Sequence, residues 1–116
     1  MSALDNADVV TSGDLAALER RATEVATRLS LVASGPRLMV LCHLAKLELE
    51  GTGEASVGTL QQAVGLSQSA LSQHLARLRE AGMVATRREA QTVHYRLADD
   101  ETRRLMRALH EIFCEG

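Results

Sequence analysis

The 116-residue sequence predicts a mainly helical α+β domain, in which two helices, a helix–turn–helix and a β-hairpin precede a last helix. Three observations lead to this prediction. Apolar residues recur at helical spacing before residue 50 and after residue 98. Two short helical segments are joined through a glycine, and the segment after them alternates apolar and polar residues as strands do. A chain of this length accommodates one domain with a modest core.

The first helix is predicted over residues 15–33, with Ser12 and Asp14 as capping residues at its start. Residues 1–13 are expected to form a flexible N-terminal arm, which leaves residues 14–116 as the folded domain. Such a helix packs on its own domain or on a partner helix, because its apolar residues are spaced alternately three and four apart as in a coiled coil. These residues are Leu15, Leu18, Ala22, Val25, Leu29 and Val32.

The second helix is predicted over residues 37–49. Ser34 and Gly35 break the chain before it, and Pro36 suits a first helical turn. The apolar positions predict a buried face made of Leu38, Leu41, Cys42, Ala45 and Leu49. A polar loop over residues 50–54 and a short strand over residues 55–57 follow.

A helix–turn–helix is the most informative prediction. Its first helix covers residues 59–64 and ends at Gly65, which suits a left-handed cap. Ser67 is a good N-cap for the second helix, residues 68–81, and Gly82 closes it. Two short helices joined by a tight turn that contains glycine are typical of this motif.

A β-hairpin and a last helix complete the predicted domain. The strands cover residues 83–88 and 93–97, with a turn over residues 89–92. The last helix covers residues 99–113 and has acidic residues at its positive end.

Periodicity separates the second helix of the helix–turn–helix into two faces. Its inward face consists of Leu71, His74, Leu75 and Leu78. Its outward face is small, polar and uncharged, with Gln68, Ser69, Ser72, Gln73 and Ala76. Small residues and amides suit close approach to base edges in double-stranded DNA, where glutamine pairs with adenine. The alternative is an ordinary solvated face, although such a face usually carries more lysine and glutamate.

Basic charge is concentrated on the same segment. The chain has a net charge of -2, whereas residues 67–97 carry five basic and two acidic residues, or +3, and the remainder carries eight and thirteen, or -5. Arg77 is expected to reach a DNA phosphate from the helix, and Arg87, Arg88 and Arg96 from the hairpin. The alternative is a mixed-charge surface without a nucleic-acid partner.

Other classes of protein are disfavoured. An enzyme is not expected, because the sequence has no phosphate-binding glycine loop, no HExxH motif and no set of nucleophile, histidine and carboxylate. No cofactor is expected. Apolar runs are too short to span a membrane, and the polar, acidic start is not typical of a signal peptide. We therefore expect a cytoplasmic protein whose Cys42 and Cys114 are thiols by default.

Residues 66–84, with the sequence LSQSALSQHLARLREAGMV, resemble the recognition segment of the ArsR family of winged-helix repressors. Residues 86–97 resemble the hairpin, or wing, of that family, and the likeness extends over about residues 14–114. It implies a homodimer held by the first and last helices, binding to an inverted-repeat DNA operator, and an inducer that releases the DNA. Ala90 and Gln91 depart from the family, which usually has glycine at the wing tip.

The resemblance also bears on the inducer. Residues 58–64 lack the cysteine pair of the family's arsenic and lead/cadmium sites. Cys42 and Cys114 have contexts similar to those of a subgroup that senses persulfides, polysulfides and oxidants. That likeness implies a disulfide or polysulfide bridge that releases the operator, so that genes for sulfide detoxification are expressed.

Three alternatives remain open. One is a zinc- or arsenite-responsive repressor, because His110 and Cys114 lie one helical turn apart and could begin a metal site. Asp99 or Asp100 of a partner chain would then have to complete the site. A second is that Cys42 is an ordinary core residue and Cys114 an idle thiol. A third is a winged-helix protein-interaction module that does not bind DNA.

Overall fold

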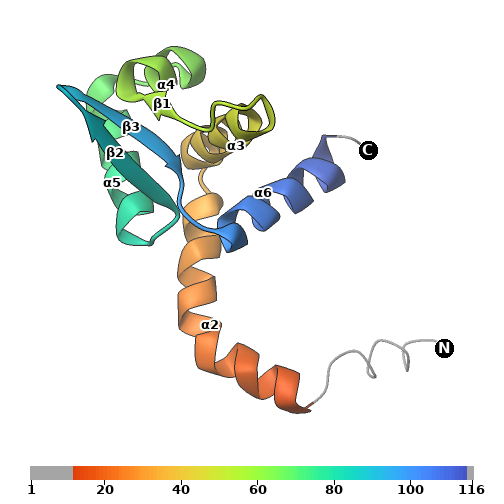
Figure 1. The fold of residues 1–116 in the computed structure, drawn as a ribbon. Helices are drawn as coiled ribbons and strands as arrows, with labels where there is room; N and C mark the ends of the chain where they lie inside the picture. Colours follow the sequence, from red (N-terminus) through yellow and green to blue (C-terminus); the bar gives the residue numbers. More distant parts are fainter. Residues whose placement is uncertain (1–11, 115–116) are drawn as a thin grey trace.

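The protein is described by a computed structural model that covers residues 12–114. Within this range it has five helices and a small antiparallel sheet, in the order expected for a winged helix–turn–helix (Figure 1). The elements are α2 (Ser12–Val32), α3 (Gly35–Leu49), β1 (Ala55–Ser56), α4 (Val57–Val64), α5 (Gln68–Glu80), β2 (Val84–Glu89), β3 (Thr92–Leu97) and α6 (Asp100–Phe113). The predicted fold class is confirmed.

Side-chain caps set the starts of four helices. Ser34, Ser56, Ser67 and Asp99 precede α3, α4, α5 and α6, and each accepts a hydrogen bond from a backbone N–H in the first turn. The N···O distances lie between 3.0 and 3.4 Å. Helix α4 begins two residues before its predicted start because Ser56 caps it.

Helix α2 begins earlier than predicted. It already includes Ser12 and Asp14, the residues expected to cap its start. The expected arm, residues 1–13, lies outside the described residues except for Ser12 and Gly13, which are helical.

The sheet has the strand order β1–β3–β2, with all pairs antiparallel. Strands β2 and β3 form the hairpin, and Glu89 pairs with Thr92, so the turn contains only Ala90 and Gln91. Ala90 has a φ of +56°, a conformation that glycine adopts with less strain. The departure from glycine at this tip therefore places an alanine in the left-handed region.

The core lies where α3, α4 and α5 meet the sheet. Leu71, Leu75 and Leu78 of α5 are buried, as predicted, and so are Met83, Val84 and Leu97 from the hairpin and the turn before it. Leu60 and Met106 extend this core to α4 and α6. Helix α5 and the hairpin thus pack on one shared core.

The predicted buried face of α3 is wrong in part. Leu41 is buried, but Cys42 and Leu49 are exposed, and the other fully buried positions are Val40 and Leu44. The helix is apolar almost all round, so spacing alone does not define one inward face. Cys42 is not an ordinary core residue.

The apolar stripe of α2 is largely unpacked within the chain. Leu15, Leu18 and Leu29 remain 48–55% exposed, whereas Val32 at the end of the helix is buried. At the end of α6, Ile112 is 64% and Phe113 is 77% exposed. Among residues 12–114, no single helix is long and apolar enough to cross a membrane, and only α2 and α3 together pass that test, as a pair bent by 93°.

Candidate DNA-binding surface and cysteine pair

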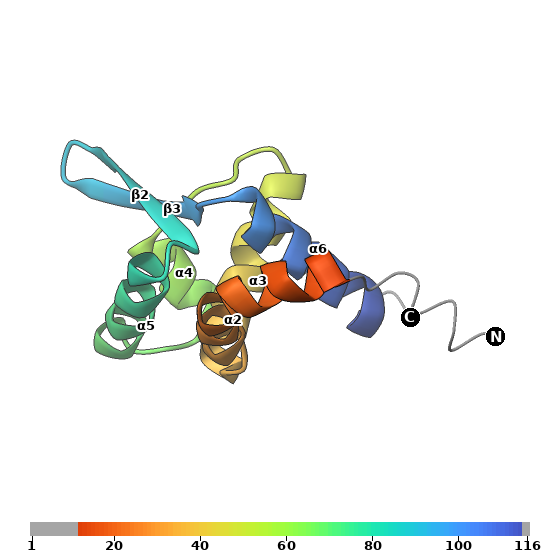
Figure 2. The same cartoon turned by 90° about the horizontal axis from the view of Figure 1, so that it is seen from below.

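Helix α5 and the hairpin lie at one end of the molecule, and α6 with the start of α2 lies at the other (Figure 2). On α5, the predicted outward residues Gln68, Ser69, Ser72 and Gln73 are exposed. None of their side chains forms a hydrogen bond with another part of residues 12–114. Arg77, one turn after Gln73, is also exposed. These donors and acceptors are therefore available to a ligand.

His74 connects the recognition helix to α3. It is half-buried, and its Nδ1 lies 3.2 Å from the Nη1 of Arg37, which donates to the neutral imidazole. Arg37 also donates from Nε to the carbonyl oxygen of Leu31 at 2.9 Å. Burial, together with the positive charges of Arg37 and Arg77, lowers the pKa of His74. His74 therefore has a structural partner and belongs to the inward face.

The basic residues of the hairpin differ in their availability. Arg87 is bound to the carboxylate of Glu54, with Nη2 at 2.8 Å from one oxygen and Nε at 3.0 Å from the other. This pair lowers the pKa of Glu54 through the hydrogen bonds from Arg87. Arg88 is exposed and Arg96 is half-buried, and neither has an ion-pair partner among residues 12–114.

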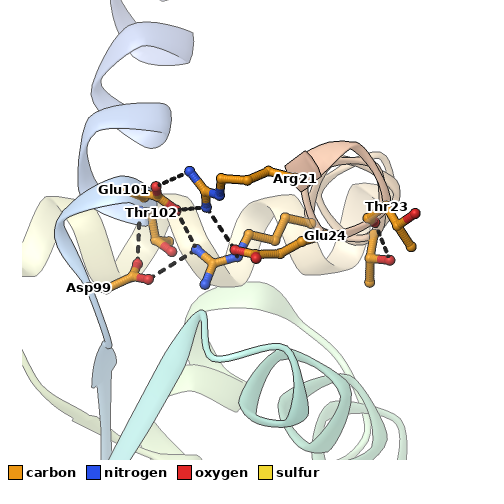
Figure 3. Close-up of polar contacts among 8 residues, drawn as sticks. Arg21, Thr23, Glu24, Asp99, Glu101 and Thr102 are labelled. Carbon is orange, nitrogen blue, oxygen red and sulfur yellow. Dashed lines mark hydrogen bonds and ion pairs between the residues drawn. The ribbon is translucent and has the colours of Figure 1, made fainter. Parts of the chain in front are cut away.

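A cluster of charged residues joins α2 to the start of α6 (Figure 3). Arg21 contacts Glu24 at 2.7 Å and Glu101 at 2.8 Å. Arg28, whose side chain is only 18% exposed, donates to Asp99 at 3.0 Å. Asp99 also caps α6 by accepting from the backbone N–H of Thr102 (Figure 3). The cluster thereby fixes the direction in which α6 leaves the hairpin.

Cys42 and Cys114 are both free thiols with exposed side chains. Cys42 lies in the middle of α3, and Cys114 directly follows α6, which packs against α3. Partial burial and, to a smaller extent, the negative charge of Cys114 raise the pKa of Cys42. The two cysteines, 72 positions apart in sequence, therefore lie on or directly after two helices that pack against each other.

A pocket lies beside Cys42, between α3 and α6. Its volume is about 480 Å³. Its lining consists of Cys42, Ala45, Lys46, Glu48 and Leu49 from α3, Leu97, and Arg103, Met106, Arg107, His110 and Glu111 from α6. Arg103 donates to Glu48 at 2.7 Å and to the carbonyl oxygen of Leu97 at 3.1 Å, and the contact with Glu48 joins the two helices within the pocket lining.

The zinc-binding alternative gains no support from this arrangement. Among residues 12–114, no three His, Cys, Asp or Glu side chains are grouped so as to hold a metal ion. Asp99 and Asp100 lie at the start of α6, the opposite end from His110 and Cys114, and each is paired with an arginine.

Comparison with known proteins gives the family. Residues 34–86 match the sequence profile described as "Bacterial regulatory protein, arsR family". The chain is also 51% identical over 100 residues to a "Biofilm growth-associated repressor" of Agrobacterium fabrum, covering 86% of this chain and 80% of that protein. This chain belongs to the arsR family of bacterial regulatory proteins. As an arsR-family member it is a DNA-binding transcriptional regulator and not an enzyme.

Solved structures agree with this assignment. The structure titled "Reduced HlyU from Vibrio cholerae N16961" has a TM-score of 0.74 and 42% identity, covering 84% of this chain and 96% of that one. A "homodimeric winged helix-turn-helix DNA-binding domain" from Mycobacterium bovis has a TM-score of 0.68 and 28% identity, covering 88% and 85%.

Two side-chain contacts of this arsR-family chain were not predicted from its sequence. The pairing of Glu54 with Arg87 spans 33 positions and depends on the register in which Ser56, His94 and Arg87 form one row across the sheet. The contact of Arg37 with His74 depends on how α3 packs on α5. No spacing in the sequence indicates either pair.

Proposed function

We propose that the chain is a homodimeric cytoplasmic repressor that binds an inverted-repeat operator and is released from it by reactive sulfur species. Its α5 residues Gln68, Ser69, Ser72 and Gln73 would contact base edges, and Arg77, Arg88 and Arg96 would contact phosphates. Arg87 would reach a phosphate only by leaving Glu54. The side chains on α5 support this assignment, since they are exposed and form no hydrogen bond with the rest of residues 12–114.

Dimerisation is supported by the apolar surface opposite the DNA-binding end. Leu15, Leu18 and Leu29 of α2 and Ile112 and Phe113 of α6 are all about half exposed or more. Large apolar side chains left exposed on a small protein are typical of an interaction surface. A two-fold axis there would present two copies of α5 to successive major grooves.

The sulfur-sensing part of the proposal rests on one observation, which is that Cys42 on α3 and Cys114 directly after α6 are both accessible thiols, and that α3 packs against α6. The raised pKa of Cys42 leaves little thiolate at neutral pH, but the thiolate that forms is a stronger nucleophile. A bridge between the two cysteines would join α3 to the end of α6.

A side-chain contact between α3 and α5 would allow such a bridge to affect DNA binding. Cys42 lies on α3 between Arg37, which contacts His74 of α5, and Leu44, which is part of the core. A shift of α3 towards α6 would therefore alter the support of α5, and a shift of α6 would alter the dimer. Both changes act on the spacing of the two recognition helices.

The test combines mass and DNA binding. Reduced protein is treated with an organic persulfide, freed of excess reagent and analysed by intact mass and operator titration. We expect two thiols to be lost, a bridge to form and operator affinity to fall, with recovery on reduction. Cys42→Ser and Cys114→Ser should each bind operator when reduced and fail to respond.

Other outcomes would overturn the proposal. Added sulfur with unchanged operator affinity would remove the regulatory role of the thiols. Release by zinc or arsenite in the presence of reductant would make the protein a metal or metalloid sensor. Operator binding without a steep salt dependence, or no binding at all, would favour the protein-interaction module.

A further inference from the structure

The pocket between α3 and α6 has the properties of a small-molecule site. Its volume of about 480 Å³ lies within the range of roughly 300–1,000 Å³ that such sites occupy. Leu97 and Met106 of its lining are buried, and Ala45 is half-buried. An organic group is thus offered an apolar surface directly beside a thiol.

Positive charge at this pocket is incompletely balanced. Arg103 is held by Glu48, but Lys46 has only an exposed ion pair with Glu50 at 4.0 Å. Arg107 is exposed and has no hydrogen bond or ion pair with any part of residues 12–114. The remaining acidic residue of the lining, Glu111, forms no ion pair with it. A guanidinium without a partner favours an anionic ligand, because it binds carboxylates through a fixed pair of donors.

We propose that this pocket binds organic persulfides that carry a carboxylate, with the carboxylate at Arg107 and Lys46 and the sulfane sulfur at Cys42. This inference rests on the proposed function, since it requires Cys42 to be the thiol that accepts sulfur. Lys46 follows Cys42 by one turn of α3, so the charge and the thiol share one side of that helix. Arg107 faces them from α6.

The chemistry proceeds in two balanced steps. The Cys42 thiolate attacks the terminal sulfur of R–S–SH, the S–S bond breaks, and RS⁻ leaves and takes up the proton that Cys42 released. Cys42 is now a persulfide. The Cys114 thiolate then attacks the sulfur attached to the Cys42 side chain and displaces HS⁻, which leaves as H₂S. In sum, one persulfide and two thiols give RSH, H₂S and one disulfide.

The experiment measures charge selectivity at Cys42. Cys114→Ser protein is used, so that the reaction stops at the Cys42 persulfide, and its rate of formation is followed by intact mass. Glutathione persulfide, which is anionic, is compared with cysteamine persulfide, which is cationic. Arg107→Glu is the test variant. Arg104→Glu is the matched control, because Arg104 is an exposed arginine of the same helix outside the pocket.

We expect Arg107→Glu to slow the reaction with glutathione persulfide about tenfold, because it replaces one attractive exposed pair by a repulsive one. The reaction with cysteamine persulfide should become faster, and Arg104→Glu should leave the ratio of the two rates unchanged. Operator binding by reduced Arg107→Glu shows that the variant is folded. If it does not bind, Arg107→Gln is used, with an expected reduction of about threefold.

The two hypotheses fail in different ways. If Cys42 reacts with both persulfides but Arg107→Glu leaves their ratio unchanged, the pocket does not select anionic persulfides, while the proposed thiol chemistry stands. If unsubstituted protein reacts with neither persulfide at Cys42, the proposed sulfur-sensing function is wrong.

Discussion

Asp99 is expected to contribute far more stability than Asp100, its neighbour of the same residue type. Asp99 caps α6 by accepting from Thr102 N at 3.0 Å, and it accepts from the half-buried Arg28 at 3.0 Å. Loss of a cap costs about 1 kcal/mol. A hydrogen bond to a charged group contributes about 1.5–3 kcal/mol when buried, and we take about 1 kcal/mol here because the Asp99 side chain is 37% exposed. Asp99→Ala should therefore lower the free energy of unfolding by about 2 kcal/mol.

Two variants separate these contributions. Asp99→Asn keeps the cap and loses the charge, so it should cost about 1 kcal/mol. Asp100→Ala should cost about 0.5 kcal/mol or less, because Asp100 is 78% exposed and 3.8 Å from Arg104. At about 4 °C per kcal/mol, the expected decreases in Tm are about 8 °C for Asp99→Ala, about 4 °C for Asp99→Asn and about 2 °C for Asp100→Ala. Thermal unfolding at one fixed protein concentration measures them, since the Tm of a protein that self-associates depends on its concentration.

The pH dependence provides an independent check of the same contact. Burial tends to raise the pKa of Asp99, but hydrogen bonds from Thr102 and Arg28 hold it below its ordinary value. The stability from Asp99 is therefore present above the unfolded value, about 3.9, and is lost as pH falls through the lower folded-state pKa. Equal Tm values for Asp99→Ala and Asp100→Ala at neutral pH would refute this account of the α2–α6 junction.

Three further predictions concern the DNA-binding surface and the thiols. Arg88→Ala should reduce the slope of log affinity against log salt concentration by about 1.8, if a dimer makes one phosphate contact per protomer through this residue. Arg87→Ala should reduce the slope by less, because Arg87 is already paired with Glu54. Equal slopes for the two variants in a fluorescence-anisotropy titration of operator DNA would contradict this. Because the pKa of His74 is lowered, its contribution to stability is present above about pH 6.5 and is lost as pH falls through the folded-state pKa. Acidification should therefore lower the urea concentration at half-unfolding more for the unsubstituted protein than for His74→Gln. The rate of Cys42 alkylation, followed by mass spectrometry as a function of pH, should have its midpoint above the ordinary pKa of a cysteine. Cys114→Ser should move this midpoint to lower pH. An unchanged midpoint would mean that the two sulfur atoms are apart.

The pattern of local residues was sufficient to predict the elements and their order. Capping serines and glycines mark the helix ends because their effect depends only on neighbouring backbone groups. Ser67 and Gly82 bound α5 to within about one residue of the prediction, and alternation identified the hairpin. The exposed face of α5 could be predicted from the helical periodicity of its apolar residues alone, because Leu71, Leu75 and Leu78 are the only large apolar residues of this helix.

Packing decided what local pattern left open. Helix α3 is apolar on most sides, so only its neighbours determine that Val40 and Leu44 are buried while Cys42 is exposed. Arg87 has the sequence context of a DNA contact, yet a carboxylate 33 positions away holds it. Contacts between distant segments determine which charges remain available to a ligand and which thiols lie near each other. Such contacts produce no periodic pattern in the sequence, so the sequence alone does not predict them.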